Sequence, residues 1–235
     1  MKGHIPNILT LLNLFCGCCA ILCVLDQQYV VAFWLLFTAG WFDFFDGLVA
    51  RWLNVQSPLG GELDSMADMV SFGIVPGMIL YVLLRASLGS DSLFYLPATP
   101  AFLLSALAGL RLAKFNLDTR QTDSFIGLPT PAMTMYVTGL MLVYHFDSLG
   151  LRDLVTNTYF VGANILLLSY LLVAEIPMFS FKMKKFQWKN NEIQFIIMGL
   201  VILLTVLVRE VAFSLVVILY VLFSLIQYFR QPKTV

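Results

Sequence analysis

The sequence predicts an all-α polytopic protein that crosses a membrane several times, and three observations support this prediction. Of the 235 residues, 60% are hydrophobic and only 12% are charged, whereas an ordinary soluble domain has about 25% charged residues. The mean hydropathy is +0.86. Apolar runs of the length that a helix needs to cross a bilayer recur along the chain. This composition excludes a soluble globular domain, a disordered chain and a coiled coil, and the zero net charge gives no sign of a nucleic-acid surface.

The apolar runs predict eight membrane spans, and the last two runs predict a C-terminal helical hairpin over 181–235. Only Arg209 and Glu210 separate the last two runs, so two half-embedded segments are the alternative there. No internal repeat or linker divides the chain, which predicts one membrane domain over 1–235. The eight predicted spans cover about 7–25, 29–51, 62–84, 97–115, 129–146, 158–178, 192–208 and 211–229.

The first run is interpreted as a retained span rather than a signal peptide, because Met1–Pro6 holds one Lys and no small-residue cleavage site follows the run. All four cysteines fall inside this run. Without a second Cys or His cluster in the sequence they are read as small hydrophobic residues and not as zinc ligands.

The distribution of Lys and Arg predicts the orientation. With the N-terminus placed in the cytoplasm, eleven of the fourteen basic residues fall on the inner side and three on the outer side, which agrees with the positive-inside rule. An even number of spans is needed to keep this bias, so both termini are predicted to be cytoplasmic. The loops at 52–61, 116–128 and 179–191 then also face the cytoplasm.

Four carboxylates on the second and third spans are the most unusual feature of the sequence. Asp43 and Asp46 lie within one third of the circumference of the second helix, and Asp64 and Asp68 lie on one stripe of the third. A loop of about ten residues makes the two helices antiparallel neighbours. We therefore expect all four carboxylates to meet just below the cytoplasmic surface of the membrane.

Charged residues inside a membrane cost about 2.5–3.5 kcal/mol each on insertion scales, before their mutual repulsion is counted. Arg51 is the only basic residue near the four carboxylates in the sequence of these spans. Protonation could relieve the repulsion, and so could two divalent cations, for which oxygen ligands are suited. A helix-packing hydrogen bond is the alternative for a single intramembrane Asp, but it does not account for four at these spacings.

The pattern D-G-x2-A-R-x8-G-x3-D-x3-D, running from Asp46 to Asp68 with Asp43 three residues ahead, resembles the signature of the CDP-alcohol phosphotransferase family. It matches at every fixed position. The resemblance covers about residues 5–180 and implies a six-helix core with two added spans. It implies transfer of a phosphoryl-linked lipid from a CDP-alcohol to a small alcohol, with release of CMP.

The resemblance also implies roles for individual residues. Asp43, Asp46, Asp64 and Asp68 would hold two Mg²⁺ or Mn²⁺ ions, and Asp68 would act as the general base, with metal ligation alone as the alternative for Asp68. Capping of the first helix is the alternative role for Asn7. The predicted nucleotide-binding residues are Asn7, Thr10, Gly47, Ala50, Arg51 and Gly60.

Three further segments, at residues 5–17, 109–116 and 125–132, resemble those of family members that transfer to L-serine. Arg111, Lys114 and Asn116 would bind a lipid phosphate or the serine carboxylate, while snorkelling to the interface is the alternative for the two basic residues. Pro129 and Thr130 would contribute to the zwitterionic acceptor site.

The sequence therefore predicts a multi-pass enzyme of the cell membrane whose active site faces the cytoplasm and uses CDP-diacylglycerol and L-serine. Another acceptor, such as glycerol phosphate or an inositol phosphate, is the alternative within the family. An ion or proton transporter is the alternative outside it, although transporters usually place carboxylates near the bilayer midplane on broken helices. A homodimer is implied by the resemblance alone.

Overall fold

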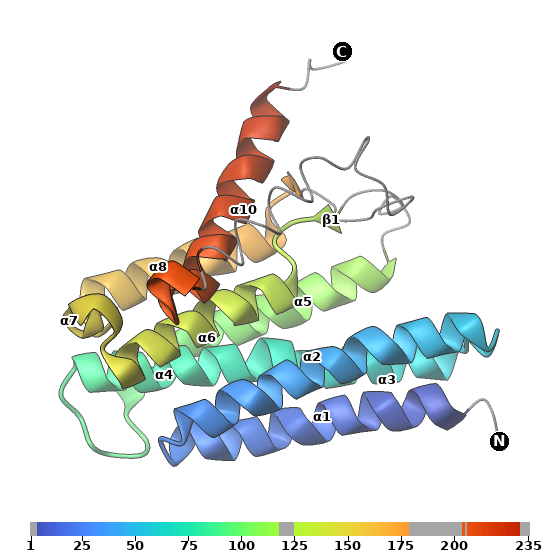
Figure 1. The fold of residues 1–235 in the computed structure, drawn as a ribbon, viewed down its shortest axis with the longest axis horizontal. Helices are drawn as coiled ribbons and strands as arrows, with labels where there is room; N and C mark the ends of the chain where they lie inside the picture. The colour runs from blue at the N-terminus through green and yellow to red at the C-terminus, as the bar shows by residue number, and fades with distance from the viewer. Residues whose placement is uncertain (1–3, 118–124, 179–203, 205, 231–235) are drawn as a thin grey trace.

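The computed structural model describes residues 4–117, 125–178, 204 and 206–230, and within them the chain is almost entirely helical. Helices α1 to α6 run along the long axis of the molecule, and α8 lies beside them (Figure 1). The elements are α1 (His4–Leu25), α2 (Tyr29–Trp52), α3 (Pro58–Asp68), the π-helical η1 (Met69–Ile74), α4 (Val75–Ser87), the 3₁₀ segment η2 (Leu96–Phe102), α5 (Leu103–Leu117), β1 (Phe125–Ile126), α6 (Thr130–Phe146), the short η3 (Ser148–Gly150), α7 (Arg152–Val155), α8 (Thr158–Val173), β2 (Pro177–Met178) and α10 (Val211–Arg230).

All six predicted core spans are helices, which confirms an all-α membrane protein. Five helical stretches of the described residues are long and apolar enough to cross a bilayer, and α3, η1 and α4 form one of them without interruption. The prediction for 158–178 was too long. Helix α8 ends at Val173, and Pro177 lies in β2, which pairs with β1 in the antiparallel sense. The predicted span 192–208 lies largely outside the described residues.

Local signals in the sequence explain where several helices begin and end. The Ser57 hydroxyl accepts a hydrogen bond from the Gly60 N–H at 3.1 Å, and Pro58 occupies the first turn of α3, where its missing N–H costs nothing. The Asn157 side chain caps α8 in the same way. Helix α6 stops at Asp147, which adopts a left-handed backbone conformation.

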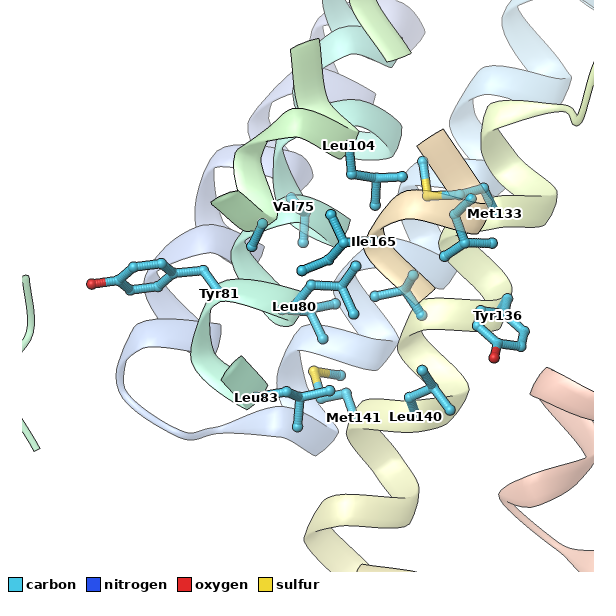
Figure 2. Close-up of a cluster of buried hydrophobic side chains, with 14 of the residues drawn as sticks. Val75, Leu80, Tyr81, Leu83, Leu104, Met133, Tyr136, Leu140, Met141 and Ile165 are labelled. Carbon is cyan, nitrogen blue, oxygen red and sulfur yellow. The ribbon is translucent and has the colours of Figure 1, made fainter. Parts of the chain in front are cut away.

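Helix α4 lies at the centre of the bundle. Ten of the eleven residues from 75 to 85 are buried, and the other one, Met78, is half-buried. This helix is therefore enclosed on every side, as a helix that is apolar all round should be. Figure 2 shows Leu80 and Leu83 of α4 packed among Leu140 and Met141 of α6 and Ile165 of α8. Helices α1 and α2, in contrast, leave many large apolar side chains exposed to the surroundings that a membrane would supply.

Three pairs of helical segments meet where a glycine of one faces a serine of the other. A Cβ on each glycine would collide with the serine hydroxyl, so the two backbones are closer than any larger residue would permit. The same hydroxyl donates a hydrogen bond to a carbonyl three or four residues before the glycine. The pairs are Gly17 with Ser71, Gly77 with Ser105 and Gly139 with Ser214, and their hydrogen bonds reach the carbonyls of Asn13, Gly73 and Tyr136 at 3.1, 2.9 and 2.9 Å.

The π-helical segment η1 begins at the residue after Asp68. Its wider turns shift the backbone hydrogen bonds, and neighbouring helices supply hydroxyl donors to its carbonyls. Ser105 of α5 donates to Gly73, and Thr134 of α6 donates to Phe72 at 3.2 Å. These contacts hold the irregular segment in place beside the predicted catalytic carboxylate.

Helix α10 confirms the last predicted span as a helix of 20 residues. It packs on α6 near its start and then leaves the other helices at a steep angle (Figure 1). Arg209 and Glu210 form the predicted turn before it, and the Ser148 hydroxyl donates to the Glu210 carboxylate at 2.7 Å.

Candidate active site

Helices α2 and α3 bring the predicted carboxylates together. One carboxylate oxygen from each of Asp43, Asp64 and Asp68 lies within 4.8 Å of the other two. Three oxygens at this separation fit around a divalent cation, which takes carboxylate ligands at about 2.0–2.6 Å. The expected convergence of the two acidic stripes therefore holds for these three residues.

Asp46 faces the same space but has a specific partner. It is 6% exposed, and its Oδ2 accepts a hydrogen bond of 2.6 Å from the Thr10 hydroxyl of α1. Thr10 is therefore an orienting partner of a predicted metal ligand, a contact that the sequence pattern did not reveal.

Among the described residues, no Lys or Arg lies within 4.0 Å of any of the four carboxylates. A buried oxygen of Asp64 also has no hydrogen-bond partner there. Carboxylates packed this closely in a region of low dielectric constant repel one another. The donor set, its charge and the unpaired oxygen all fit divalent cations, which supply positive charge and accept oxygen ligands.

A cavity of about 270 Å³ opens beside the acidic cluster. It lies between the N-terminal half of α1, the C-terminal end of α2 and the first turns of α3. All six residues that the sequence predicts for nucleotide binding line it, and Asp46 and Asp64 form part of its wall. These six residues are Asn7, Thr10, Gly47, Ala50, Arg51 and Gly60.

The glycines keep this cavity open. A Cβ on Gly60 would lie 3.4 Å from the Asn7 Oδ1 and 3.2 Å from the Ser57 hydroxyl, and a Cβ on Gly47 would lie 4.0 Å from the Arg51 guanidinium. A larger side chain at either glycine would enter the space that a ligand would occupy. The small residues of the sequence pattern therefore have a steric reason at these positions.

The residues predicted to bind the acceptor or a lipid phosphate do not all meet. Arg111 of α5 is buried, lies over the Phe115 ring at 6.0 Å and interacts electrostatically with Asp68. Lys114 and Asn116 are exposed at the end of α5, and the Asn116 amide donates to the Ser65 hydroxyl at 2.8 Å. Asn116 thus links α5 to α3 in this structure.

Pro129 and Thr130 lie at the start of α6, outside the lining of the cavity. Thr130 is 1% exposed. Its carbonyl accepts a hydrogen bond from the Thr134 hydroxyl, which also reaches η1. The structure connects Thr130 to the acidic cluster through the backbone of η1, and not through a direct contact.

Two further residues lie close to this site, and the sequence did not reveal the contacts that they make there. Asn13 of α1 is fully buried, and its amide nitrogen lies 3.4 Å from Asp68 Oδ1. Tyr220 of α10 interacts electrostatically with Arg111. Asn13 lies one turn after Thr10 in α1, so helical periodicity places both residues on one face of this helix. Tyr220 is far away in sequence and carried no such signal.

A second and larger cavity, of about 550 Å³, lies between α2, η1, α6 and α10. Its lining is almost wholly apolar and includes Phe37, Trp41 and Phe44 of α2, Phe72 of η1 and Phe213 of α10. Phe44 and Phe72 are close in sequence to Asp43 and Asp68, so one end of this apolar cavity lies near the level of the acidic cluster.

Comparison with known proteins assigns the family. The sequence profile of the CDP-alcohol phosphatidyltransferases matches residues 3–226. The chain belongs to this family. The match extends through most of α10, beyond the core of 5–180 that the motif indicated.

Three curated relatives of this family member share one name. The CDP-diacylglycerol–serine O-phosphatidyltransferase of Bacillus subtilis is 35% identical over 180 residues, which are 77% of this chain and 92% of the relative. The enzyme of that name from Helicobacter pylori strain J99 is 33% identical over 95% of this chain and 90% of its own. The one from Methanocaldococcus jannaschii is 30% identical over 96% and 94%. The family member described here is therefore a phospholipid-synthesising transferase of a membrane.

Proposed function

We propose that the protein transfers a phosphatidyl group from CDP-diacylglycerol to the hydroxyl of L-serine, forming phosphatidylserine and CMP. The observation that carries this proposal is the meeting of Asp43, Asp64 and Asp68 beside a cavity lined by every residue of the predicted nucleotide set. Serine as the acceptor is supported by the names of relatives that align over most of the chain.

The chemistry follows from the position of Asp68. Its carboxylate takes the proton from the serine hydroxyl, and the hydroxyl oxygen attacks the phosphorus that carries diacylglycerol. The bond between this phosphorus and the oxygen that bridges to CMP breaks, and CMP leaves with the electron pair. No Ser, Cys or His lies among the cluster residues as a nucleophile, so direct transfer without a covalent enzyme intermediate is the simplest course.

The acidic residues have a second role in this proposal. Two divalent cations held by Asp43, Asp46, Asp64 and Asp68 would neutralise the diphosphate and make the phosphorus more susceptible to attack. Thr10 holds Asp46 in the orientation that this ligation needs, through its 2.6 Å hydrogen bond. Arg51, at the wall of the cavity, supplies a fixed positive charge for the cytidine diphosphate.

The two cavities divide the donor lipid into a polar and an apolar part. The smaller cavity would take the cytidine and its phosphates, and the apolar cavity between α2, α6 and α10 would take an acyl chain. Buried Arg111, next to Asp68, would hold the serine carboxylate or a lipid phosphate, with exposed Lys114 further out on the same helix. In this proposal the reacting phosphorus would lie at the boundary between the polar and apolar spaces.

Purified protein in detergent or vesicles tests the proposal. CMP release should require CDP-diacylglycerol, Mg²⁺ or Mn²⁺, and L-serine together, and the lipid product should carry the label of radioactive serine. Glycerol phosphate and an inositol phosphate are the comparison acceptors. If CMP release does not depend on serine but depends on one of these two alcohols, that alcohol is the acceptor and serine is not.

We further propose that the active site opens to the cytoplasm and that the enzyme is a homodimer. The orientation is supported by the eleven-to-three distribution of basic residues, and the dimer by the family resemblance alone. Reporter domains fused to the C-terminus test the orientation, because activity of a cytoplasmic reporter is expected. Chemical cross-linking in native membranes tests the dimer, and a monomer band alone would refute it.

A further inference from the structure

The apolar cavity of about 550 Å³ between α2, η1, α6 and α10 is elongated along α2. Its end near the acidic cluster is formed by Phe44, the residue after Asp43, and by Phe72, four residues after Asp68. From Phe44 the lining residues of α2 follow one stripe of that helix as far as Phe33. These two residues are eleven positions apart, which at 1.5 Å per residue is about 16 Å. The cavity therefore begins beside the acidic cluster and ends about three helical turns away.

Two phenylalanines form the far end of the cavity. The ring centroids of Phe33 in α2 and Phe213 in α10 lie 5.2 Å apart, and both residues line the cavity. The Ser214 hydroxyl, next to Phe213, donates to the Tyr136 carbonyl of α6 at 2.9 Å. A Cβ on Gly139 of α6 would lie 3.1 Å from the Cβ of Phe213. Helix α10 is thus in close contact with α6 at this level, which limits how far the pair of rings can move.

The lining suits a hydrocarbon chain. Most of its side chains are aromatic or aliphatic. Its two threonines, Thr134 and Thr138, both donate their hydroxyls to backbone carbonyls, so these groups are already paired and do not call for a polar ligand. Phe37 and Trp41, on the α2 wall, are half-exposed. The cavity is therefore open toward the surrounding lipid, and an acyl chain can enter it sideways.

The length of the cavity matches one acyl chain. The hydrocarbon core of a bilayer is about 30 Å thick, so a chain in one leaflet extends over about 15 Å. The distance between Phe44 and Phe33 along α2, about 16 Å, is nearly the same. With the diphosphate of the donor at the acidic cluster, the methyl end of one acyl chain would reach the rings of Phe33 and Phe213.

We propose that this cavity selects the donor lipid by the length of its acyl chain, and that Phe33 and Phe213 set the upper limit. This inference rests on the proposed use of CDP-diacylglycerol as the donor. A chain longer than the cavity meets the two rings before its diphosphate reaches the acidic cluster. A shorter chain leaves part of the lining without packing contacts. Because lipid tails are as apolar as the lining, the selection depends on fit and not on transfer out of water.

The experiment gives the purified enzyme an equimolar mixture of dilauroyl, dipalmitoyl and diarachidoyl CDP-diacylglycerol in mixed micelles with L-serine and Mn²⁺. Mass spectrometry follows the consumption of each donor, and the ratio of initial rates gives the relative kcat/KM within one sample. The unmodified enzyme should prefer the dipalmitoyl to the diarachidoyl donor by at least about ten-fold, the lower limit for discrimination of one methylene group by an apolar pocket. Equal use of the three donors would overturn the proposal.

Two variants should shift the preference in opposite directions. Phe213→Ala removes one ring from the far end, so the use of the diarachidoyl relative to the dipalmitoyl donor should rise by about ten-fold. Gly40→Leu places a side chain midway along the cavity, where a Cβ would lie 3.9 Å from the Phe72 ring, and should favour the dilauroyl over the dipalmitoyl donor by a similar factor. A general loss of stability does not produce opposite shifts. Unchanged ratios, or shifts in the same direction, would contradict the proposal.

The matched controls are Gly162→Leu and Phe160→Ala. Both residues belong to α8 and lie outside the lining of the cavity. A Cβ on Gly162 meets nothing within 4 Å, and Phe160 is half-buried. Both variants should keep the chain-length preference of the unmodified enzyme. Failure of the proposed function would look different, because the unmodified enzyme would then consume none of the three donors with serine.

Discussion

Asp68 has more functional groups around it than the other residues of the site. It lies with Asp43 and Asp64 within 4.8 Å, accepts from the Asn13 amide and interacts with Arg111. We predict that Asp68→Asn lowers CMP release by about 10²–10⁴-fold, because the amide cannot accept the hydroxyl proton. Asp153→Asn, in α7 away from the cluster, is the control. Unchanged turnover of Asp68→Asn would remove Asp68 from the role of general base.

Thr10 gives a second prediction at a single residue. Thr10→Val keeps the shape of the side chain but removes the hydroxyl that donates to Asp46 at 2.6 Å. A hydrogen bond to a charged group contributes about 1.5–3 kcal/mol, so the concentration of Mn²⁺ that gives half-maximal activity should rise at least about ten-fold. Thr38→Val is the matched control, since the Thr38 hydroxyl bonds only to the Trp34 carbonyl of its own helix. Equal responses of the two variants would refute the role of Thr10.

For single residues, spacing in the sequence identified the acidic side chains of the site but not the α1 residues that contact them. The positions of Asp43, Asp64 and Asp68 on two adjacent helices were sufficient to predict their meeting. The Thr10 contact with Asp46 and the Asn13 contact with Asp68 join residues 36 and 55 positions apart. They depend on how α1 lies against α2 and α3, and helical periodicity within one segment does not contain that information.

Between helices, the glycine and serine contacts determine how close the backbones come. We predict that Gly17→Val destabilises the protein by about 1–3 kcal/mol, the usual cost of overpacking, and lowers activity, because its side chain would push η1 and Asp68 away from α1. Thermal unfolding in detergent measures the first effect and CMP release the second.

The control for that variant is Gly162→Val in α8, where a Cβ meets nothing within 4 Å. Its unfolding temperature should stay close to that of the unmodified protein. A similar loss in both variants would mean that β-branched side chains in these helices, and not the contact with Ser71, cause the effect.

Helices and their order could be predicted from apolar runs, but the irregular elements could not. The π-helical turn after Asp68 depends on hydroxyl donors from α5 and α6 that reach its carbonyls. This turn therefore arises from tertiary contacts, which override local preference. The early end of α8 has a local cause that the predicted span overlooked, because Pro177 cannot continue a helix through Val173, four residues before it.

For the molecule as a whole, divalent cations should increase stability. A ligand at 100 times its dissociation constant adds about 2.7 kcal/mol to the stability of the state that binds it. We expect Mn²⁺ to raise the unfolding temperature of the unmodified protein, and chelation to reverse the rise. The double variant Asp43→Asn, Asp64→Asn should lose most of this response, because two of the three clustered carboxylates are gone. A full response in that variant would locate the cation elsewhere.

Glu210, in the turn before α10, predicts a pH dependence. Partial burial works to raise the pKa of Glu210, but the hydrogen bonds from Ser148 and its own backbone N–H, together with Arg209, outweigh it and hold the pKa below its usual value. A lowered pKa in the folded state stabilises the fold above the usual pKa, and this stabilisation is lost as the pH falls through the folded value.

The variant Glu210→Gln should therefore match the unmodified protein most closely below about pH 4 and be less stable at neutral pH. Unfolding temperatures measured from pH 7 downward test this, with Ser148→Ala expected to change the profile in the same direction. A constant difference between Glu210→Gln and the unmodified protein at every pH would contradict it.

The whole-molecule predictions are confirmed where hydropathy and the family pattern decide the outcome, while the orientation inferred from the basic residues stays a prediction. Hydropathy gave a polytopic helical protein and the family pattern gave its class, which the profile match over residues 3–226 confirms. The direction of α10 relative to the bundle (Figure 1) and the apolar cavity that it borders at Phe213 had no counterpart in the sequence, because an apolar helix can pack at many angles.

The π-helical segment after Asp68 divides the third span into two helices, α3 and α4. Its wider turns rotate the side chains of one helix about the axis relative to those of the other. The first half, α3, turns Asp64 and Asp68 toward α2, while the second half, α4, is anchored among α6 and α8. Each residue of an α-helix advances the face by about 100°. Deleting one residue from 69–74 would therefore rotate Asp64 and Asp68 away from α2 while the packed second half stays in place. This short stretch thus determines which way the acidic residues face relative to the helix packing.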